Sequence, residues 1–494
     1  MVLTILGIAS GRAATKYVTP GGGGEFGGAD WDNACSNIQA AVTACAGEAA
    51  SIIYVRYGTY TNDAPIGVSY FPGLTIEGEY AGTGLDYTNL PTIVTRGGAT
   101  TRIIDGYCST VTLARLTITN GAAIEGAGMR LTNCVAVVSN CTVKNNGVSI
   151  SASLTGCGIQ AIRGALTIDS CLFLNNVNFD PYNKTGGGLY AASLALVIRD
   201  SIFSGNQFAG NNGCVGGAAY ITGGTAMISR CSFLTNSVSK NNGGNSSGGA
   251  IYASGVPALT ITNCNFAGNF VTAYLNNPAT RNGGVLYFTG ATTASIIDST
   301  FDANASFDSA EDMYLNTTGP TIIRGTRMQG GYWSAINKLN TGALLITNCL
   351  FASYAGHGII AAAGVITVAY STIADNSGWG ITNSGATITV RDSILWNNLV
   401  GGVTGGATID YSDCQEDHAG TGNTNVNPLF TSGRYYLAVN GLTGQTQDSP
   451  LIDKGSASAA SLGLDLLTTR TDSAGDGGAA VDLGYHYTNG LADT

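Results

Sequence analysis

Charge is scarce in this sequence. Only 11% of its 494 residues are charged, histidine occurs three times, and the net charge is −10. A protein that binds nucleic acid needs a patch of basic side chains to neutralise the phosphates. No such patch is present, so the composition argues against a nucleic-acid partner.

Long apolar runs are also missing. Beyond the N-terminus, no segment approaches the roughly 20 apolar residues that a helix needs to cross a bilayer. The first residues, MVLTILGIASGRAATKYV, contain a short apolar run from Val2 to Ile8, followed by small residues. This pattern resembles the later part of a secretory signal peptide. Residues 1–14 are therefore a candidate signal peptide, cut after Ala13, and we expect a secreted or cell-surface protein without a transmembrane segment.

The sequence has no CxxC pair, which argues against a metal site built on its twelve cysteines. Disulfides are the usual use of cysteine in a secreted protein. Several of these cysteines, however, share a repeat position that serine fills elsewhere, so small size is the expected requirement: Cys141, Cys171, Cys231, Cys264 and Cys349. Cys141 and Cys171 lie one repeat apart and could bridge if their side-chain directions allow. We predict no metal and no cofactor.

Repetition is what the sequence has in abundance. The phrase LTIDSCLFLNN at 166–176 returns as LVIRDSIFSGN, MISRCSFLTN and LTITNCNFAGN. The positions equivalent to Cys171 are Leu116, Cys141, Ser201, Cys231, Cys264, Ser299, Gly325, Cys349, Ser371, Ser393 and, less clearly, Cys414. Apolar and polar residues alternate within each phrase, as they do in β-strands.

Like residues recur at fixed offsets and predict stacked columns. Two residues after the reference position stands an apolar column of Val143, Phe173, Phe203, Phe233, Phe266, Phe301, Phe351, Ile373 and Leu395. Five residues after it stand Asn146, Asn176, Asn206, Asn236, Asn269, Asn304, Asn376 and Asn398. Asparagine tolerates the left-handed conformation of a tight bend, and stacked amides can bond to one another. These asparagines predict a corner of each repeat.

A second, glycine-rich phrase runs in register with the first. It reads GAGMR, GCGIQ, GGGLY, GGAAY, GGAIY and GGVLY between residues 126 and 287. Each repeat therefore carries at least two strands separated by bends. Coils that place like residues on like residues are typical of a parallel β-helix, an all-β solenoid.

The chain resembles the bacterial right-handed parallel β-helix repeat proteins of the pectin-lyase-like fold. The segments YVTPGG (17–22), NIQAAV (37–42) and IIYVRYGTY (52–60) are similar to that family's opening, in which a short amphipathic helix precedes the first coil. SPLIDKG (449–455) and VDLGYHY (481–487) resemble the tail of surface-associated members. His486 stands where that tail usually has glutamate, and Lys454 replaces a small residue.

These observations predict one β-helix with a cap at each end. Residues 15–110 form the N-terminal helical cap and first coils, 111–426 the parallel β-helix repeats, and 427–494 an irregular C-terminal capping tail. The tail is expected to cover or flank the last coil. Neighbouring repeats carry longer bends at 177–188, 237–249 and 270–284, which would form one continuous face.

Catalytic signals are weak. The GHG motif around His357 matches one short polygalacturonase motif, but that motif's companions are absent, and the next repeat reads GWG at 378–380. Two acidic spots, Glu311-Asp312 and Glu416-Asp417-His418, lie outside the strand phrases. We interpret both as solvated loop charge, since adjacent residues cannot all face one metal ion or substrate. No catalytic residue is predicted.

One column is a candidate ligand or partner face, expected to point outward: Arg130, Gln160, Tyr190, Tyr220, Tyr252 and Tyr287. Exposed rings could stack on sugars or dock a partner. The alternative is an aromatic ladder that only stabilises its sheet.

Three functions remain open from the sequence. The first is a non-catalytic extracellular structural or adhesive protein, self-assembling into fibres through its ends. The second is a polysaccharide lyase or hydrolase, and the third is a sugar-binding module without catalysis. Polysaccharide and a second copy of the chain are thus the candidate partners.

Overall fold

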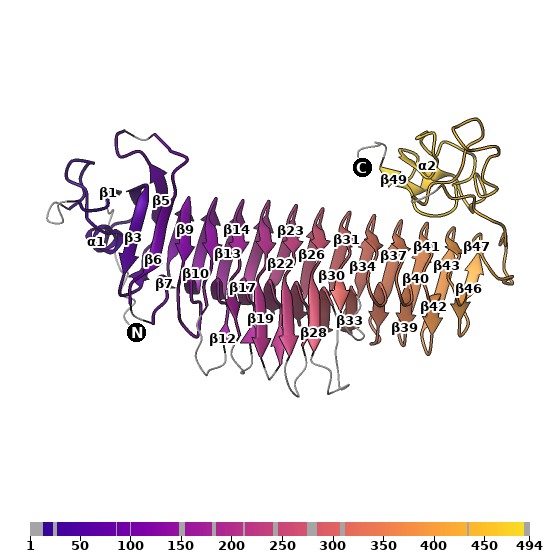
Figure 1. The fold of residues 1–494 in the computed structure, drawn as a ribbon, viewed down its shortest axis with the longest axis horizontal. Coiled ribbons are helices and arrows are strands. Elements are labelled where there is room, and N and C mark those ends of the chain that lie inside the picture. The colour runs from indigo at the N-terminus through magenta and orange to yellow at the C-terminus, as the bar shows by residue number, and fades with distance from the viewer. Residues whose placement is uncertain are drawn as a thin grey trace, which may run out of the picture. The chain divides into compact units, whose positions relative to one another are not determined.

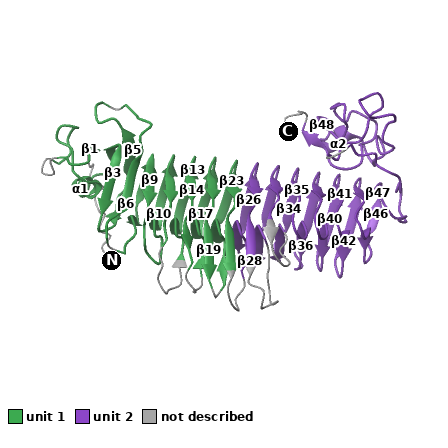
Figure 2. Cartoon of the chain, viewed as in Figure 1, with its two compact units in different colours: residues 1–245 green, residues 246–494 purple. Residues whose placement is uncertain are grey.

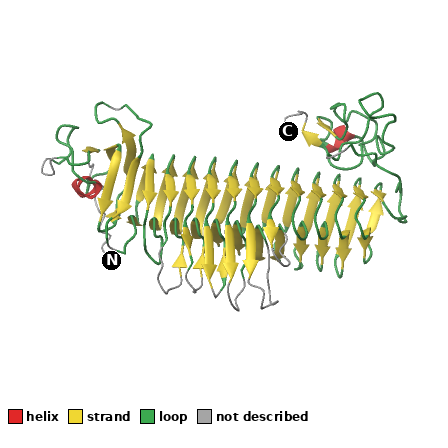
Figure 3. Ribbon diagram, in the orientation of Figure 1, coloured by secondary structure: helices red, strands yellow, loops and turns green. Residues whose placement is uncertain are grey.

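The computed structural model describes residues 13–22, 27–84, 86–98, 100–147, 154–179, 184–210, 213–240, 246–273, 284–306, 312–431 and 434–488. The candidate signal peptide lies almost wholly outside these residues. The chain divides into two compact units, 1–245 and 246–494, shown in different colours in Figure 2. Strands dominate both units (Figure 3), and no described helix is long and apolar enough to cross a membrane.

Unit 1 is a stack of coils whose strands pair in parallel with the equivalent strands of the next coil (Figure 1). One sheet contains β1 (Ala14–Val18), β2 (Ser51–Arg56), β4 (Ile66–Gly67), β5 (Leu74–Tyr80), β7 (Ile104–Tyr107), β8 (Thr110–Ala114), β10 (Met129–Ser139), β13 (Ile159–Asp169), β17 (Leu189–Arg199), β21 (Ala219–Thr222) and β22 (Thr225–Ser229). The second contains β3 (Gly58–Asn62), β6 (Thr92–Arg96), β9 (Leu116–Thr119), β11 (Thr142–Lys144), β14 (Leu172–Leu174), β18 (Ile202–Ser204) and β23 (Ser232–Leu234).

The long bends of unit 1 add two small parallel sheets. Their strands are β12 (Leu154–Thr155), β16 (Lys184–Thr185) and β20 (Cys214–Val215), and β15 (Val177–Asn178), β19 (Gln207–Gly210) and β24 (Ser237–Lys240). Phe208, Cys214 and Lys184 are fully buried in these additions. The bends therefore add short paired strands to the coils. Parts of the bends lie outside the described residues.

Unit 2 repeats the same plan, and its later coils are shorter, with 22 residues between Ser371 and Ser393 against 30 between Cys171 and Ser201 in unit 1. One set of strands is β25 (Ile251–Ser254), β29 (Leu286–Gly290), β33 (Met313–Thr317), β36 (Ile336–Lys338), β39 (Ile359–Ala361), β42 (Trp379–Asn383) and β45 (Gly401–Thr404). The next is β26 (Ala258–Thr262), β30 (Ala294–Ile297), β34 (Thr321–Arg324), β37 (Leu344–Thr347), β40 (Val365–Ala369), β43 (Thr387–Arg391) and β46 (Thr408–Asp410). The third is β27 (Asn265–Ala267), β31 (Thr300–Asp302), β35 (Arg327–Gln329), β38 (Leu350–Ala352), β41 (Thr372–Ala374), β44 (Ile394–Trp396) and β47 (Asp413–Cys414). A short pair, β28 (Phe270–Ala273) with β32 (Ala305–Ser306), continues the bends.

The predicted apolar column is confirmed. Phe173, Phe203 and Phe233 are fully buried, and their rings stack with centroids 4.4 and 5.2 Å apart. In unit 2, Phe266 stacks on Phe301 at 4.6 Å. Because alternate residues of a strand face opposite sides, this column fixes which half of each phrase lies in the core.

The asparagine column is a hydrogen-bonded ladder. The amide nitrogen of Asn176 donates to the amide oxygen of Asn206 at 2.9 Å, and Asn206 donates in the same way to Asn236. Each amide also donates to a backbone carbonyl of the preceding coil. The predicted conformation was wrong, however. The left-handed residue is the one before the asparagine, such as Asn175 or Gly205, and the asparagines themselves satisfy the buried backbone at the bend.

The structure corrects the register at two repeats. The backbone N–H of Ser299 faces the hydroxyl of Thr326, so Thr326 and not Gly325 occupies the reference position. Gly325 takes the left-handed bend before it, with a φ of 60°. Near the end, Ser393 pairs in the same manner with Ser412, and Cys414 pairs with Leu395 in the apolar column.

The cysteine column follows the small-residue interpretation. All twelve cysteines are thiols that form no disulfide, and only Cys108 is exposed. Serine and cysteine side chains in this column both accept a hydrogen bond from the backbone of the preceding coil. The N–H of Cys171 donates to the Ser201 hydroxyl, and the N–H of Cys349 donates to the Ser371 hydroxyl. Cys141 and Cys171 stack without a bridge, and the Cys171 sulfur accepts from the Cys141 N–H.

The predicted helix at the start of the chain is confirmed as α1 (Ile38–Ala44). Asn37 caps it by accepting from the N–H of Ala40, and Ile38, Ala41 and Val42 face the core. The Gln39 side chain accepts from the N–H of Gly67 in β4, at 2.7 Å. The helix therefore covers polar backbone of the first coils as well as apolar side chains.

The residues from 411 to the end of the described chain perform two separate tasks. Segment 411–426 folds over the last coil, where Gln415 exchanges two hydrogen bonds of 2.7 Å with the backbone of Asn398. The tail, 427–488, packs on the side of the coils: the amide of Asn348 bonds to both backbone groups of His486, and the N–H of Tyr485 donates to Thr372. The tail contains α2 (Ala459–Leu462) and the antiparallel pair β48 (Leu467–Thr468) and β49 (Tyr487–Thr488). It thus flanks the coils.

Candidate functional site

The predicted ligand face forms aligned columns in each unit. In unit 1, Arg130, Gln160, Tyr190 and Tyr220 pair in register along β10, β13, β17 and β21. In unit 2, Tyr252 pairs with Tyr287, and the column continues to Tyr314, which the sequence reading missed. Tyr314 was missed because the repeat around it, DMYLN, lacks the preceding glycines.

The tyrosine rings of these columns stack on one another. Tyr190 and Tyr220 lie 5.3 Å apart with an interplanar angle of 1°, and Tyr287 lies 4.8 Å from Tyr252 and 5.1 Å from Tyr314. Tyr287 and Tyr314 are buried, contrary to the expectation of an outward-facing row. A ring face that already contacts a neighbouring ring cannot also stack on a sugar, so the geometry fits an aromatic ladder.

The two polar members of the column are engaged as well. Arg130 donates to both carboxylate oxygens of Asp105, at 2.9 and 2.8 Å, and its pKa is raised chiefly by that hydrogen-bonded pair. Gln160 is 3% exposed, contrary to the outward expectation, and donates to the Thr155 hydroxyl at 2.6 Å. Both side chains tie neighbouring segments of unit 1 together.

His357 is half-buried between two coils. Its Nδ1 accepts a hydrogen bond of 2.9 Å from the backbone N–H of Trp379, in the repeat that reads GWG. Burial lowers the pKa of the imidazole, which favours the neutral ring that this hydrogen bond requires. His357 thereby supplies a coil-to-coil contact.

The acidic spot at 416–418 closes the last coil. Both carboxylate oxygens of Glu416 accept from the N–H of Gly402, at 3.0 and 2.9 Å. The His418 Nε2 lies 3.8 Å from Glu416, beyond hydrogen-bond distance. Glu416 therefore satisfies a backbone donor at the edge of β45, while its side chain stays 40% exposed, as expected of a solvated charge.

Asp312, in contrast, is not the expected solvated loop charge. It is 4% exposed and accepts a hydrogen bond from the hydroxyl of Tyr354, which is itself fully buried. Burial raises the pKa of Asp312 to about 7. Its sequence neighbour Glu311 lies outside the described residues. No signal in the sequence separates a buried aspartate from a solvated one when both follow a loop.

A groove of about 380 Å³ lies between the coils of unit 2 and the tail. The coils contribute the residues at or just after the ends of four successive strands: Gln329, Ser353, Asp375, Trp396 and Asn397. The tail contributes Asn427, Phe430, Thr431, Arg434 and Tyr435. Aromatic rings beside amide, carboxylate and guanidinium groups are the side chains that bind polar ligands such as sugars.

One carboxylate organises this groove. Asp375 accepts from the Asn397 amide at 2.6 Å and from the Tyr435 hydroxyl at 2.9 Å. Burial raises the pKa of Tyr435, so the phenol stays protonated and donates. The sequence could not reveal the groove because Asp375 and Tyr435 are 60 residues apart.

Comparison with known proteins identifies the fold. Residues 249–415 match the family model described as the right handed beta helix region. The fold is a right-handed parallel β-helix. No curated protein matches the sequence. Among solved structures, the chain is similar to pectate lyase Pel9A, with 12% identity over 96% of each chain and a TM-score of 0.34. A likeness this weak says nothing about activity.

Proposed function

We propose that the protein works outside the cell as a non-catalytic structural or adhesive β-helix. One observation carries this proposal: the side chains with the best catalytic prospects, His357 and Glu416, both bind backbone N–H groups of neighbouring coils. A general base must instead reach a proton of the substrate. Engaging these atoms in coil contacts favours a structural role.

The tyrosine columns support the same proposal. Tyrosine rings that stack on their neighbours add stability along the sheet, as cross-strand aromatic pairs do. The columns therefore reinforce the coils of each unit, which is a useful property for a surface protein.

The first and last coils of the β-helix determine whether the protein can assemble end to end. An open strand edge pairs readily with another chain unless something covers it. Here α1 covers the first coils and segment 411–426 covers the last one. A fibre that forms through the ends would use contacts between these covering segments, in a head-to-tail arrangement without a built-in stop.

The test is to recover the native protein from cells that make it. Fractionation should find the protein in the medium or at the cell surface. Electron microscopy should show whether it occurs as single molecules or as fibres. Recovery only from the cell interior would contradict the proposal. If only single molecules are seen, the self-assembly hypothesis is rejected, while the structural role remains.

The groove beside the tail favours a second candidate function, binding of a polysaccharide without cleavage. Trp396 is half-buried there and could offer a ring face to a sugar, while Arg434 is exposed and could pair with an acidic group. A glycan array should then show binding that Trp396→Ala abolishes. The matched control is Trp333→Ala, which removes an exposed tryptophan outside the groove. Binding that both variants keep would reject the groove as the site.

A further inference from the structure

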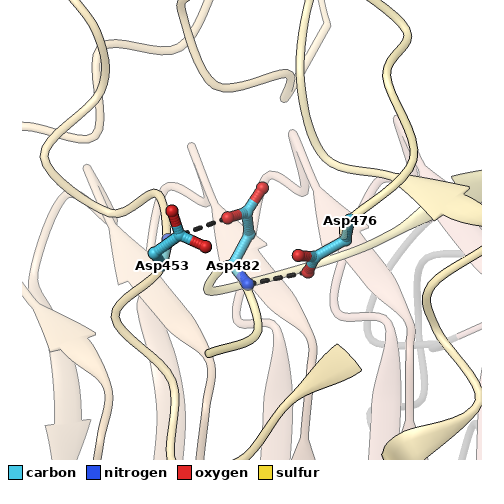
Figure 4. Close-up of side chains that lie close together, drawn as sticks. All are labelled: Asp453, Asp476 and Asp482. Carbon is cyan, nitrogen blue, oxygen red and sulfur yellow. Dashed lines mark hydrogen bonds between the residues drawn. The ribbon is translucent and has the colours of Figure 1, made fainter. Parts of the chain in front are cut away.

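Three aspartates converge in the tail. Asp453, Asp476 and Asp482 each place one carboxylate oxygen within 4.8 Å of the others. They come from three separate segments, and Figure 4 shows their side chains close together. Asp476 and Asp482 are each 1% exposed, while Asp453 is exposed. The cluster is therefore mostly enclosed, with one side open to solvent.

Three of the four oxygens of the buried pair have partners. The Oδ1 of Asp482 accepts from the N–H of Asp453 at 2.8 Å, and its Oδ2 accepts from the Thr469 hydroxyl at 2.5 Å. The Oδ2 of Asp476 accepts from the N–H of Asp482 at 2.7 Å and lies 2.9 Å from the Nε2 of His486. These contacts fix the two carboxylates in place.

The remaining oxygen, Oδ1 of Asp476, is buried and has no hydrogen-bond partner. Figure 4 shows the Asp476 carboxylate pointing toward Asp482. Leaving a charged oxygen buried and unpaired is costly, and native proteins rarely do so without a reason. The Asp476 Oδ1 atom is therefore available to coordinate a metal cation.

Negative charge also exceeds positive charge here. Against three carboxylates, the nearest guanidinium is that of Arg470, whose Nε lies 3.6 Å from Asp482 and 4.0 Å from a fourth aspartate, Asp472. An added cation would relieve this repulsion.

We propose that the tail binds a calcium ion through Asp453, Asp476 and Asp482. Calcium binds carboxylate oxygens at about 2.3 to 2.6 Å, so two of its ligands lie at most about 5 Å apart. The separation of 4.8 Å or less fits this limit. The donors are all oxygen, which suits calcium better than zinc, and magnesium is seldom held by a dedicated set of protein carboxylates. Exposed Asp453 gives the ion access.

Such an ion would lock the tail onto the coils. Asp482 lies four residues before His486, whose backbone is bound by Asn348. Asp453 lies three residues before Ser456, whose N–H and hydroxyl both donate to Asp392 of the coils, at 2.6 and 2.9 Å. An ion that joins Asp453 to Asp482 and Asp476 would connect the segment around Ser456 to the segment around His486, and both segments bind the coils. Calcium should therefore stabilise the docked tail.

The test uses the full chain after treatment with a chelator. Titration calorimetry with calcium chloride should detect one site, and calcium should raise the unfolding temperature and slow proteolysis within the tail. Asp453→Asn, at an exposed position that tolerates the change, should weaken binding about tenfold or more because it removes a charged ligand. Asp465→Asn, an exposed aspartate of the same tail, should bind as the unaltered protein does.

Three outcomes would overturn the proposal. One is the absence of calcium binding by the unaltered protein. Another is equal affinity in Asp453→Asn and the unaltered protein, which would mean adventitious binding elsewhere. The third is tighter binding of zinc or magnesium chloride than of calcium chloride in parallel titrations.

Discussion

The hydroxyl group of Tyr354 donates a hydrogen bond to the carboxylate of Asp312 in the interior of unit 2. Tyr354 stands where the following repeat has the ladder residue Asn376, and its N–H still donates to the Asn376 amide oxygen at 3.0 Å. Space for its ring comes from Gly331 of the adjacent coil, where any side chain would collide with the ring. The ladder is thus interrupted at the repeat that contains a buried acid.

This pair predicts a dependence of stability on pH. The pKa of Asp312 is about 7 in the folded protein, above the value of about 4 for an unfolded aspartate. Between these values the folded state binds more protons than the unfolded state. The free energy of unfolding should therefore fall as pH rises from about 4 to about 7.

Asp312→Asn should remove this part of the pH dependence, because an amide can accept the Tyr354 hydrogen bond without titrating. Denaturant unfolding at a series of pH values checks the slope. The matched control is Asp465→Asn, an exposed aspartate of the tail, which should keep the slope of the unaltered protein. An unchanged slope in Asp312→Asn would show that Asp312 is ionised in the folded state.

Phe203→Ala should destabilise the coils of unit 1 by about 3 to 5 kcal/mol, because it empties a space between two stacked rings. Hydrogen exchange of the amides in β14, β18 and β23 should accelerate accordingly. Ile202→Ala in the same strand is the control, since Ile202 is 37% exposed and faces outward. Equal exchange in the two variants would refute the register.

The asparagine ladder can be tested separately. Asn206→Ala removes the donor to Asn236 and the donor to the Phe173 carbonyl, and leaves buried polar groups unpaired. A loss of about 1 to 3 kcal/mol is expected. Denaturant unfolding should show it, while the outward-facing Ser204→Ala should change little. A neutral effect of Asn206→Ala would mean that water replaces the amide.

The columns explain why so much of the fold could be predicted from the sequence. Phe203 contacts residues one repeat away on either side, so the physical requirement for an aromatic ring recurs in the sequence itself. Gly325 was misplaced by one position because glycine suits the left-handed bend and the neighbouring Thr326 resembles serine only in its hydroxyl. Periodicity fails where one repeat uses a different residue for the same task.

The candidate sites could not be predicted in this way. The groove at Trp396 and the aspartates around Asp476 need contacts that no repeat encodes, because the tail packs on coils far from it in the sequence. Burial has the same difficulty: Asp312 carries a loop-like sequence signal, yet its carboxylate is buried and accepts a hydrogen bond from another coil. Only the folded chain shows which charges are enclosed.

The edge of the last coil gives a prediction about association. Replacing Gln415 and Glu416 together by alanine frees the backbone groups of Asn398 and the N–H of Gly402. An unsatisfied edge pairs with other chains, so sedimentation velocity should show concentration-dependent oligomers. Asp417→Ala, an exposed neighbour, should stay in the state of the unaltered protein. A monomeric double variant would mean that other residues of 411–426 suffice to cover the edge.

The most direct test of the non-catalytic account is a digest of a panel of acidic and neutral polysaccharides with the unaltered protein, with and without added calcium. New reducing ends report hydrolysis, and unsaturated sugar products report lyase activity. The account predicts neither product above the level of a buffer blank. Cleavage by the unaltered protein that is lost in His357→Ala or Glu416→Gln, with the fold retained, would contradict it.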